Sequence, residues 1–318
     1  MDFNHNNLKE LIKKHYCIQL SSINKINIQS LNELFYLTSD SGQKYILKLY
    51  TSGNQNVLEN TKLIQEMIRK NIGISPKVYE NKYNRFVSKK GKLIFSLEDF
   101  VNGTYPNCNE SVLLQISTKL SLLHKTFKKI GDNKVDFKVI SKNEIHDKLY
   151  KDYAEIDEFS KINTNVSYID RFKKLILLRL KVLDRYDISY SNRYYQLIHN
   201  DFRPSNCLID DKRFYVIDFD FASLGDVLVE ILRSAILFSN FNRTNVNLYL
   251  KNYFKCMYPD NPVYSIKNLS YNLLCYLVNS SFPIYLHTRL EDKTVINIID
   301  ERIQLIKFCV SAINEVND

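Results

Sequence analysis

The sequence predicts an α+β fold in two lobes, with a smaller antiparallel sheet at the N-terminus and a larger, mainly helical C-terminal part. Short apolar segments separated by turn residues fill roughly the first hundred positions, which is the pattern of paired strands. After residue 220 the apolar residues recur at helical spacing instead. A chain of 318 residues is long enough to divide its core in this way. We place the lobes at residues 1–102 and 103–318.

The composition is that of a globular protein with reduced thiols. The formal net charge is +9, but no run of Lys or Arg exceeds two residues, so the charge indicates a solvated surface and not a nucleic-acid site. No run of 18 apolar residues could span a bilayer, and the N-terminus lacks the pattern of a signal peptide. Six scattered cysteines form no metal-ligand pattern, and the simplest location is the cytoplasm.

The N-terminal part is expected to contain one leading helix, six strands and one further helix. Alternating apolar residues and the turn Ser39–Gly42 define the first strands, and a 3.6-residue period defines the helices. The expected elements are the helix 8–16, the strands 23–28, 33–38 and 43–50, the helix 57–70, and the strands 77–80, 84–88 and 92–99.

Lys48 lies in the middle of an apolar strand. It shares a strand face with Ile46 and Tyr50, because side chains alternate along a strand. Burying a lone ammonium group is costly, so this position favours an anionic partner. The alternative is a lysine at a sheet edge with its ammonium in water.

The C-terminal part is expected to be mainly helical, with one short strand before the block that starts at residue 198. Residues 130–163 are polar and weakly periodic, which is typical of a surface excursion. His124 ends the first helix and is expected to be a packed, hydrogen-bonded histidine. The expected elements are the helices 109–128 and 168–183, the strand 195–198, and the helices 226–238, 245–257, 265–274 and 293–316.

The block from residue 198 to residue 220 carries polar groups that are spaced for phosphoryl transfer. Asp201 follows His199 by two residues, and Asn206 follows Asp201 by five. Phosphoryl transfer requires a group that orients the attacking hydroxyl, and Asp201 is placed for that role. Asn206 and Asp218 carry the oxygen ligands that Mg²⁺ prefers.

Asn206 and Asp218 are expected to lie together. The apolar runs 207–209 and 214–217 flank Asp210–Lys212, which is typical of a hairpin turn. A hairpin brings the start of its first strand next to the end of its second. The two oxygen ligands are therefore expected to share one metal ion.

This block resembles the catalytic core of the aminoglycoside phosphotransferase and choline kinase superfamily, whose members are relatives of the protein kinases. That family has a His-x-Asp-x-x-x-x-Asn loop followed by an Asp at the end of the next strand, which here are His199, Asp201, Asn206 and Asp218. The segment 225–230 is similar to the family's Gly-Asp-Pro-x-x-Asp-Leu, with Val in place of Pro and Glu in place of the second Asp.

The resemblance implies a bilobal protein-kinase-like fold and a small-molecule kinase. Such an enzyme uses ATP and Mg²⁺ to transfer the γ-phosphoryl group to a hydroxyl, with Asp201 as the catalytic residue and Asn206 and Asp218 on the metal. His199 is expected to brace the loop. The implied partner is a small molecule with a hydroxyl group, and neither nucleic acid nor a membrane is expected.

The resemblance also implies a nucleotide site around Lys48, which would reach the phosphates and pair with a helix glutamate. Glu59 is favoured over Glu66 as this partner, by its place in the helix that leads to Gly73-Ile74-Ser75-Pro76. The glycine-free loop 29–32 takes the place of the phosphate-covering loop, with Ser30 and Asn32 as its contacts.

The segment 97–103 resembles the hinge that holds the base. The family's pattern here is Glu-x-x-x-Gly, which the segment approaches with four residues between Glu98 and Gly103, and Phe100 or Val101 would lie against the purine face. Recognition by backbone groups leaves little trace in side chains, so ATP and GTP remain alternatives.

Several functions fit this resemblance. An aminoglycoside phosphotransferase-like enzyme is the first reading, and a choline, ethanolamine or other amino-alcohol kinase is the leading alternative. A catalytically silent, kinase-like binding protein is a further alternative. A protein kinase is disfavoured, because Asp218-Phe219 is followed by Asp220 and not by glycine.

Overall fold

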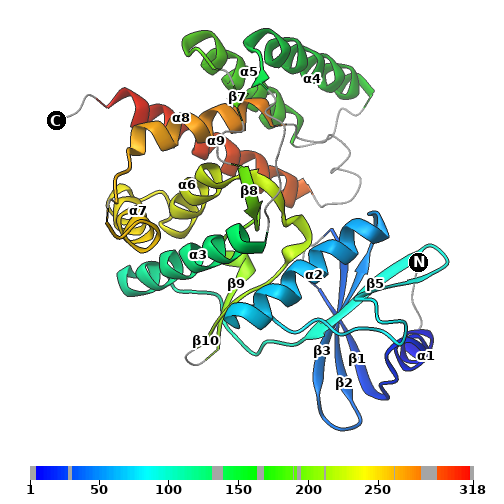
Figure 1. Ribbon diagram of the computed structural model, residues 1–318. Helices are drawn as coiled ribbons and strands as arrows, with labels where there is room; N and C mark the ends of the chain where they lie inside the picture. Colours follow the sequence, from blue (N-terminus) through cyan, green and yellow to red (C-terminus); the bar gives the residue numbers. More distant parts are fainter. Residues whose placement is uncertain are drawn as a thin grey trace. The chain divides into compact units, whose positions relative to one another are not determined.

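The protein is described by a computed structural model in which two compact units are distinguished (Figure 1). The first comprises Met1–Asn107 and His199–Ser223, and the second comprises Cys108–Ile198 and Leu224–Asp318. The α+β fold class is confirmed, whereas the lobe boundary at residue 102 stays a prediction. The described residues are 5–27, 31–130, 139–162, 168–188, 190–191, 195–210, 213–260, 262–280 and 292–315.

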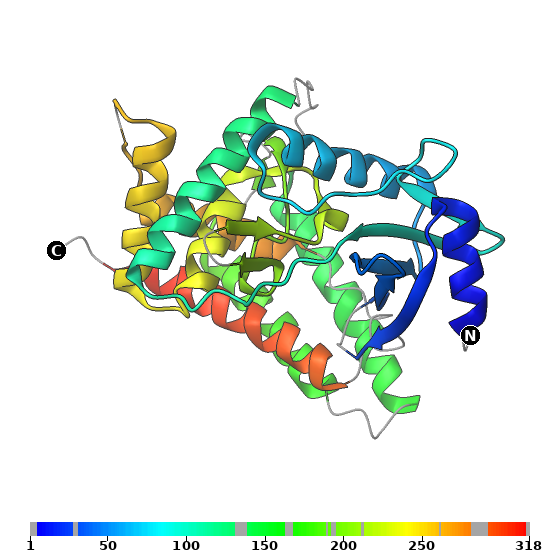
Figure 2. The ribbon, with the colours of Figure 1, turned by 90° about the horizontal axis from the view of Figure 1, so that it is seen from below.

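The first unit is built on a five-stranded antiparallel sheet with the order β1-β2-β3-β5-β4. Buried side chains from β2, β3 and β5 form one core with the apolar face of α1, His5–Tyr16, which lies beside β1 (Figure 2). The expected strand at 77–80 is reduced to a single bridge between Val78 and Glu98. The strands are β1 Leu20–Ile26, β2 Glu33–Ser39, β3 Lys44–Tyr50, β4 Val87–Lys90 and β5 Leu93–Asp99.

Helix α2, Gln55–Ile72, has well-defined ends. The side chain of Asn54 accepts a hydrogen bond from the Asn56 N–H and caps the first turn. Gly73 ends the helix with φ of 67°, a left-handed conformation that glycine adopts at little cost. The helix buries an unusual face, because Lys62 and Gln65 are fully buried on it beside apolar residues.

The expected hairpin forms in the first unit. Strand β9, Cys207–Asp210, pairs with β10, Arg213–Val216, so that Cys207 lies opposite Val216. The turn residues 211 and 212 lie outside the described residues. Short 3-10 turns flank the hairpin, η1 at Pro204–Asn206 and η2 at Phe219–Phe221. The hairpin therefore carries the candidate catalytic residues at its open end.

The second unit is mainly helical. Helix α3 packs on α7, α4 on α5, and α8 on both α6 and α9. Within the segment 130–163, for which the sequence predicts no element, helix α4 forms and buries Ile145, Leu149 and Ile156. Two short strand pairs, β6–β7 and β8–β11, also occur. The helices are α3 Glu110–Ile130, α4 Lys142–Ile162, α5 Ile169–Arg185, α6 Val227–Phe238, α7 Arg243–Met257, α8 Ile266–Asn279 and α9 Asp292–Asn314.

The helices of the described ranges do not suit a bilayer, since none is both long enough and apolar enough to cross one. The strand pairs join β6 Val139–Ile140 to β7 Tyr190–Ser191, and β8 Tyr195–Ile198 to β11 Ser223–Asp226. All six cysteines are free thiols.

Candidate functional site

His199 braces the loop that carries Asp201. Its ring is fully buried, and Nε2 donates to the main-chain oxygen of Ile217 over 3.1 Å. Nδ1 then accepts the Asp201 N–H at 3.3 Å. The imidazole thus ties the start of the loop to the end of β10. Asn200 between them adopts a left-handed φ of 66°, which is uncommon outside glycine.

Asp201 and Asn206 are in direct contact. The Asn206 side-chain N–H₂ donates to Asp201 Oδ2 over 2.8 Å and to the Asp201 main-chain oxygen over 2.9 Å. Because the amide nitrogen is used on Asp201, the amide oxygen is the atom left for a metal. The main-chain oxygen of Asn206 accepts from the Ile217 N–H at 2.9 Å. This bond places Asn206 beside the residue that precedes Asp218.

Asp218 itself has a strained backbone, with φ of 63° and ψ of 61°. A non-glycine residue in this region costs of order 1–3 kcal/mol and is typical of functional sites. The side chain is about one-third exposed, and its Oδ1 accepts from Lys48 Nζ at 2.7 Å. The strained turn therefore directs a carboxylate toward the lysine of β3.

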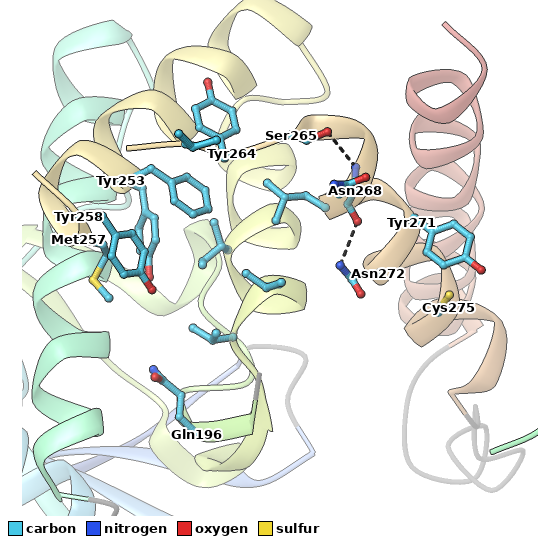
Figure 3. A pocket seen from close by; sticks show the side chains of 16 residues that line it. Gln196, Tyr253, Met257, Tyr258, Tyr264, Ser265, Asn268, Tyr271, Asn272 and Cys275 are labelled. Atoms are coloured by element: carbon cyan, nitrogen blue, oxygen red, sulfur yellow. Dashed lines mark hydrogen bonds between the residues drawn. The ribbon is translucent and has the colours of Figure 1, made fainter. Parts of the chain in front are cut away.

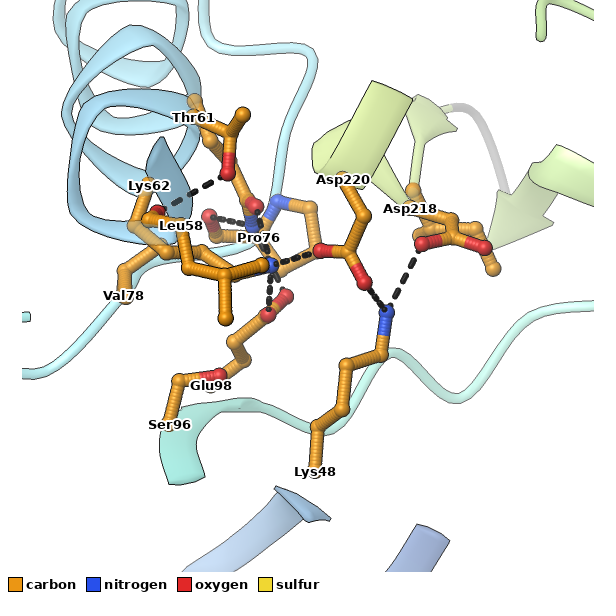
Figure 4. A network of polar contacts seen from close by, with 12 residues as sticks. Lys48, Leu58, Thr61, Lys62, Pro76, Val78, Ser96, Glu98, Asp218 and Asp220 are labelled. Atoms are coloured by element: carbon orange, nitrogen blue, oxygen red, sulfur yellow. Dashed lines mark hydrogen bonds and ion pairs between the residues drawn. The ribbon is translucent and has the colours of Figure 1, made fainter. Parts of the chain in front are cut away.

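Lys48 belongs to a chain of alternating charges (Figure 4). Its ammonium contacts Asp218 at 2.7 Å and Asp220 Oδ2 at 2.8 Å. The other oxygen of Asp220 lies 2.9 Å from Lys62 Nζ, which in turn lies 2.7 Å from Glu98. We call these five residues the charge chain. All of them belong to the first unit.

Asp220 is the centre of this chain. Besides the two lysines it accepts longer hydrogen bonds from the Tyr50 hydroxyl at 3.4 Å and the Asn32 amide at 3.3 Å. Burial would raise the pKa of this carboxyl, but Lys48 and Lys62 outweigh burial and lower the pKa well below its usual value. Asp220 is therefore charged at neutral pH.

The pKa values of the two lysines are shifted in the opposite direction, upward. Burial would lower the pKa of Lys48, but Asp220 and Asp218 raise it above the ordinary value. The pKa of Lys62 is likewise raised, by Asp220 and Glu98 against burial. Both ammonium groups therefore stay charged although their side chains are almost completely buried.

The expected pair between Lys48 and Glu59 does not form. The Glu59 carboxylate instead accepts the main-chain N–H groups of Phe86 and Val87 at 2.9 and 2.8 Å and lies 3.3 Å from Arg85. It thus anchors the start of β4 to α2, which is a use that helical periodicity does not reveal. Glu66, the alternative, pairs with Arg69 on the same helix. Neither glutamate of α2 supplies the lysine's partner.

Two of the other expected nucleotide contacts, Asn32 and Glu98, contact residues of the charge chain. Asn32 reaches Asp220, and Glu98 receives Lys62. Phe100 lies edge-to-face with Tyr36 at 4.9 Å, while its N–H donates to the Lys44 main-chain oxygen. Ser30 lies outside the described residues.

Two site residues were missed in the sequence, Lys62 and Asp220. Asp220 stands in the same short block as Asp218, so its proximity was available as a signal. Lys62 follows the buried Leu58 by one helical turn and therefore shares its face. That spacing was the only signal, because a lysine is ordinarily assigned to the exposed face.

The donor set at the open end of the hairpin fits Mg²⁺. This ion is commonly held by one or two protein oxygens together with phosphates and water, not by a complete protein cage. The Asn206 amide oxygen and the Asp218 carboxylate provide such a pair. In the described part of the chain no cluster of three or more His, Cys, Asp or Glu residues could hold a metal.

The second unit contains a separate cavity of about 590 Å³ (Figure 3). Its wall includes the stacked rings of Phe254 and Tyr264, 5.0 Å apart, together with Tyr258 and Asn268. None of the lining residues in the described ranges is charged. The cavity therefore offers aromatic faces and neutral hydrogen-bonding groups.

One lining residue of the cavity is tied to a buried polar network. The Tyr253 hydroxyl lies 2.7 Å from His124 Nδ1, and His124 Nε2 lies 2.7 Å from Glu230. Because the carboxylate accepts from Nε2–H, the hydroxyl donates to Nδ1. His124 is thus a packed, hydrogen-bonded residue of the helical core, as expected.

Known proteins resemble this chain in one sequence region and in the whole fold. Residues 147–260 match the model of a phosphotransferase enzyme family. No curated protein sequence matches the chain.

Solved structures share the fold at low sequence identity. A spectinomycin phosphotransferase in complex with ADP and spectinomycin is 14% identical, with coverage of 98% of this chain and 99% of that chain and a TM-score of 0.64. An amicoumacin kinase in complex with AMP-PNP and Ca²⁺ is 15% identical, with 98% and 94% coverage and a TM-score of 0.60. A choline kinase from Cryptosporidium parvum is 12% identical, with 91% and 90% coverage and a TM-score of 0.55.

These matches agree with the motif that begins at His199. The family model covers the loop of Asp201 and Asn206 and the strand end of Asp218. At such low identity the solved structures establish the fold alone. The family match and the fold confirm that this chain resembles the aminoglycoside phosphotransferase and choline kinase superfamily.

Proposed function

We propose that this protein is an ATP- and Mg²⁺-dependent kinase that phosphorylates a hydroxyl group of a small molecule. The observation that carries the proposal is the joint placement of four side chains in the first unit. Asp201 contacts Asn206, the Asn206 backbone bonds to Ile217 next to Asp218, and Asp218 contacts Lys48. A base, two metal ligands and a phosphate-binding cation are the parts that phosphoryl transfer needs.

The nucleotide phosphates would be held by Lys48 and the metal by Asn206 and Asp218. A bound Mg²⁺ supplies positive charge against the phosphate oxygens. Lys48 suits its role because its neighbours keep it charged and its strand fixes its direction. Asn32 and Phe100 are the remaining candidates for contacts with the phosphates and the base.

Asp201 would act on the acceptor. A new bond forms between the acceptor oxygen and the γ-phosphorus, while the bond between that phosphorus and the β-γ bridging oxygen breaks and releases ADP. The acceptor's hydroxyl proton passes to Asp201 and then to solvent. Assistance of this kind is typically worth about 10²–10⁴-fold in rate.

Transfer of radiolabelled phosphate from ATP to a panel of acceptors tests the proposal. We expect one class of small alcohol to be labelled in the presence of Mg²⁺. Asp201→Ala and Asp218→Ala should abolish labelling while the chain stays folded by circular dichroism. Asp210→Asn, on the same hairpin but at its other end, is the matched control and should keep activity. Near-normal labelling by either alanine variant would overturn the assignment.

The acceptor panel should cover both leading classes. Aminoglycosides are polycations and favour acidic pockets, whereas amino-alcohols such as choline favour aromatic faces. The uncharged aromatic cavity of the second unit supports including amino-alcohols and neutral sugars. ATP binding without transfer to any acceptor would favour the silent, kinase-like binding protein.

A further inference from the structure

Helix α2 presents a lysine to the site where the resemblance implies a glutamate. Lys62 has no exposed surface, and its ammonium contacts Asp220 at 2.9 Å and Glu98 at 2.7 Å (Figure 4). Gln65, one turn further along the same face, donates to the second oxygen of Glu98 at 2.8 Å. The contact from α2 to the site therefore has the reverse polarity of a lysine–glutamate pair.

We propose that Lys62 is a positioning residue that aims Lys48 at the nucleotide phosphates by acting through Asp220. This inference rests on the proposed kinase function. Lys62 holds Asp220 Oδ1, which leaves Oδ2 to receive Lys48 at 2.8 Å. Lys48 then has one fixed partner in Asp220, while Asp218 is the partner it shares with the proposed metal.

The placement of Asp220 supports this division of roles. Its side chain is almost completely buried and is held from two sides by the lysines, whereas the Asp218 side chain is about one-third exposed. An incoming cation therefore has better access to Asp218 than to Asp220. Lys48 would keep its bond to Asp220 when Asp218 turns to a metal.

Charge gives a second reason why Lys62 matters for phosphates. The charge chain contains three carboxylates and two ammonium groups, a formal charge of −1. Replacing Lys62 by a neutral residue would change this to −2 beside a polyphosphate. Interactions between buried charges are weakly screened, so the added repulsion would persist at ordinary salt concentrations.

A purely structural role for Lys62 makes a different prediction. If Lys62 served only to satisfy Glu98 and hold α2, its loss would weaken every ligand of the site. If Lys62 acts through Asp220 on Lys48, its loss should weaken the binding of ligands that carry phosphate groups and leave the binding of other ligands unchanged. ADP and adenosine differ in this respect alone.

Calorimetric titration of the full chain with ADP and with adenosine, both with Mg²⁺, separates these roles. We expect Lys62→Met to lower the affinity for ADP about tenfold and to leave the affinity for adenosine unchanged within about twofold. Lys62→Arg keeps the charge and should restore ADP affinity. Lys70→Met, on the same helix with a side chain that is 66% exposed, is the control and should bind both ligands normally.

A double-mutant cycle tests the route through Lys48. Lys48→Met should show the same selective loss of ADP, and the Lys48→Met/Lys62→Met pair should lose little more, because both changes remove one coupled contact. Lys62→Gln provides a second way to remove the charge that holds Asp220 if Lys62→Met does not fold, and the same selective loss is expected.

The outcomes distinguish the two proposals. Equal weakening of ADP and adenosine by Lys62→Met, or additive losses in the double variant, would overturn the positioning role alone. Undiminished ADP affinity in both Lys62→Met and Lys62→Gln would do the same. Failure of the unaltered chain to bind ADP would overturn the kinase function together with this inference.

Discussion

Both units bury positively charged side chains, but the partners are carboxylates in the first unit and a neutral hydroxyl in the second. In the first unit Lys48 and Lys62 alternate with carboxylates along the charge chain. In the second unit the buried Arg179 donates to a neutral hydroxyl, that of Ser280, over 3.1 Å. The contrast isolates what a counter-charge does for a buried cation.

The pKa directions express this difference. The carboxylates raise the pKa of Lys48 in spite of burial. Burial, followed by the repulsion of Arg302, lowers the pKa of Arg179 to about 9. The Arg179 Nε–H, moreover, has no hydrogen-bond partner within the described ranges. A buried cation is therefore stabilised in the first unit and tolerated in the second.

Removing the shared carboxylate should have the largest effect on stability. Asp220→Ala would leave two buried ammonium groups without their common partner, and breaking such a pair typically costs about 3–5 kcal/mol. Urea unfolding measured at pH 7 gives the difference. Asp210→Ala, at the far end of the hairpin, should change the unfolding free energy by no more than about 0.5 kcal/mol. A cost below about 1 kcal/mol for Asp220→Ala would mean that water replaces the carboxylate.

Acid should weaken the first unit through the same residue. The pKa of Asp220 is lowered in the folded chain. As the pH falls below about 4, the Asp220 carboxylate is therefore protonated in the unfolded chain before it is protonated in the folded chain. Its contribution is complete above the unfolded pKa and is lost as the pH falls toward the folded one. The unfolding free energy should therefore fall by up to about 1.4 kcal/mol per pH unit from this group. Asp220→Asn should show a shallower acid slope, and equal slopes would contradict the assignment.

Neutralising the arginine of the second unit should have the opposite sign. Among the described residues no carboxylate forms an ion pair with Arg179, and because burying an unpaired charge is costly, an apolar side chain of similar length should be neutral or stabilising there. We expect Arg179→Met to raise the unfolding free energy by about 1 kcal/mol, whereas Lys62→Met should lower it. Chemical denaturation of the two variants in parallel makes the comparison direct. A loss in both variants would show that the partner's charge is not decisive.

The hairpin was predicted correctly from the sequence because two strands and a turn determine its geometry locally. Cys207 pairs with Val216, so Asn206 and Asp218 must flank the same open end. The face of α2 could not be predicted in the same way. Its apolar residues Val57 and Leu63 are 57% and 47% exposed, whereas Lys62 is buried.

This inversion has a physical reason. Apolar periodicity identifies the buried face of a helix only when that face is apolar. Around Lys62 the burial of polar groups is offset by carboxylates that come from β5 and from η2, and these lie far away in the sequence. The assignment of Glu59 as the lysine's partner failed for the same reason, because the Glu59 carboxylate instead accepts the main-chain N–H of Val87 in β4. Long-range charge pairing of this kind leaves no local pattern.

The prediction with the smallest expected effect tests whether ADP affinity depends on the order of α2 or on its buried charge. Asn54 caps α2 about two turns before Lys62, and Asn54→Ala should cost about 1 kcal/mol of stability by fraying the first turn. Because the ion pairs of Lys62 hold the helix beyond that turn, the affinity for ADP should not change. Asn54→Asp keeps an acceptor at the cap and should restore stability in thermal unfolding. A loss of ADP affinity in Asn54→Ala as large as that in Lys62→Met would assign the effect to the order of α2 and not to its buried charge.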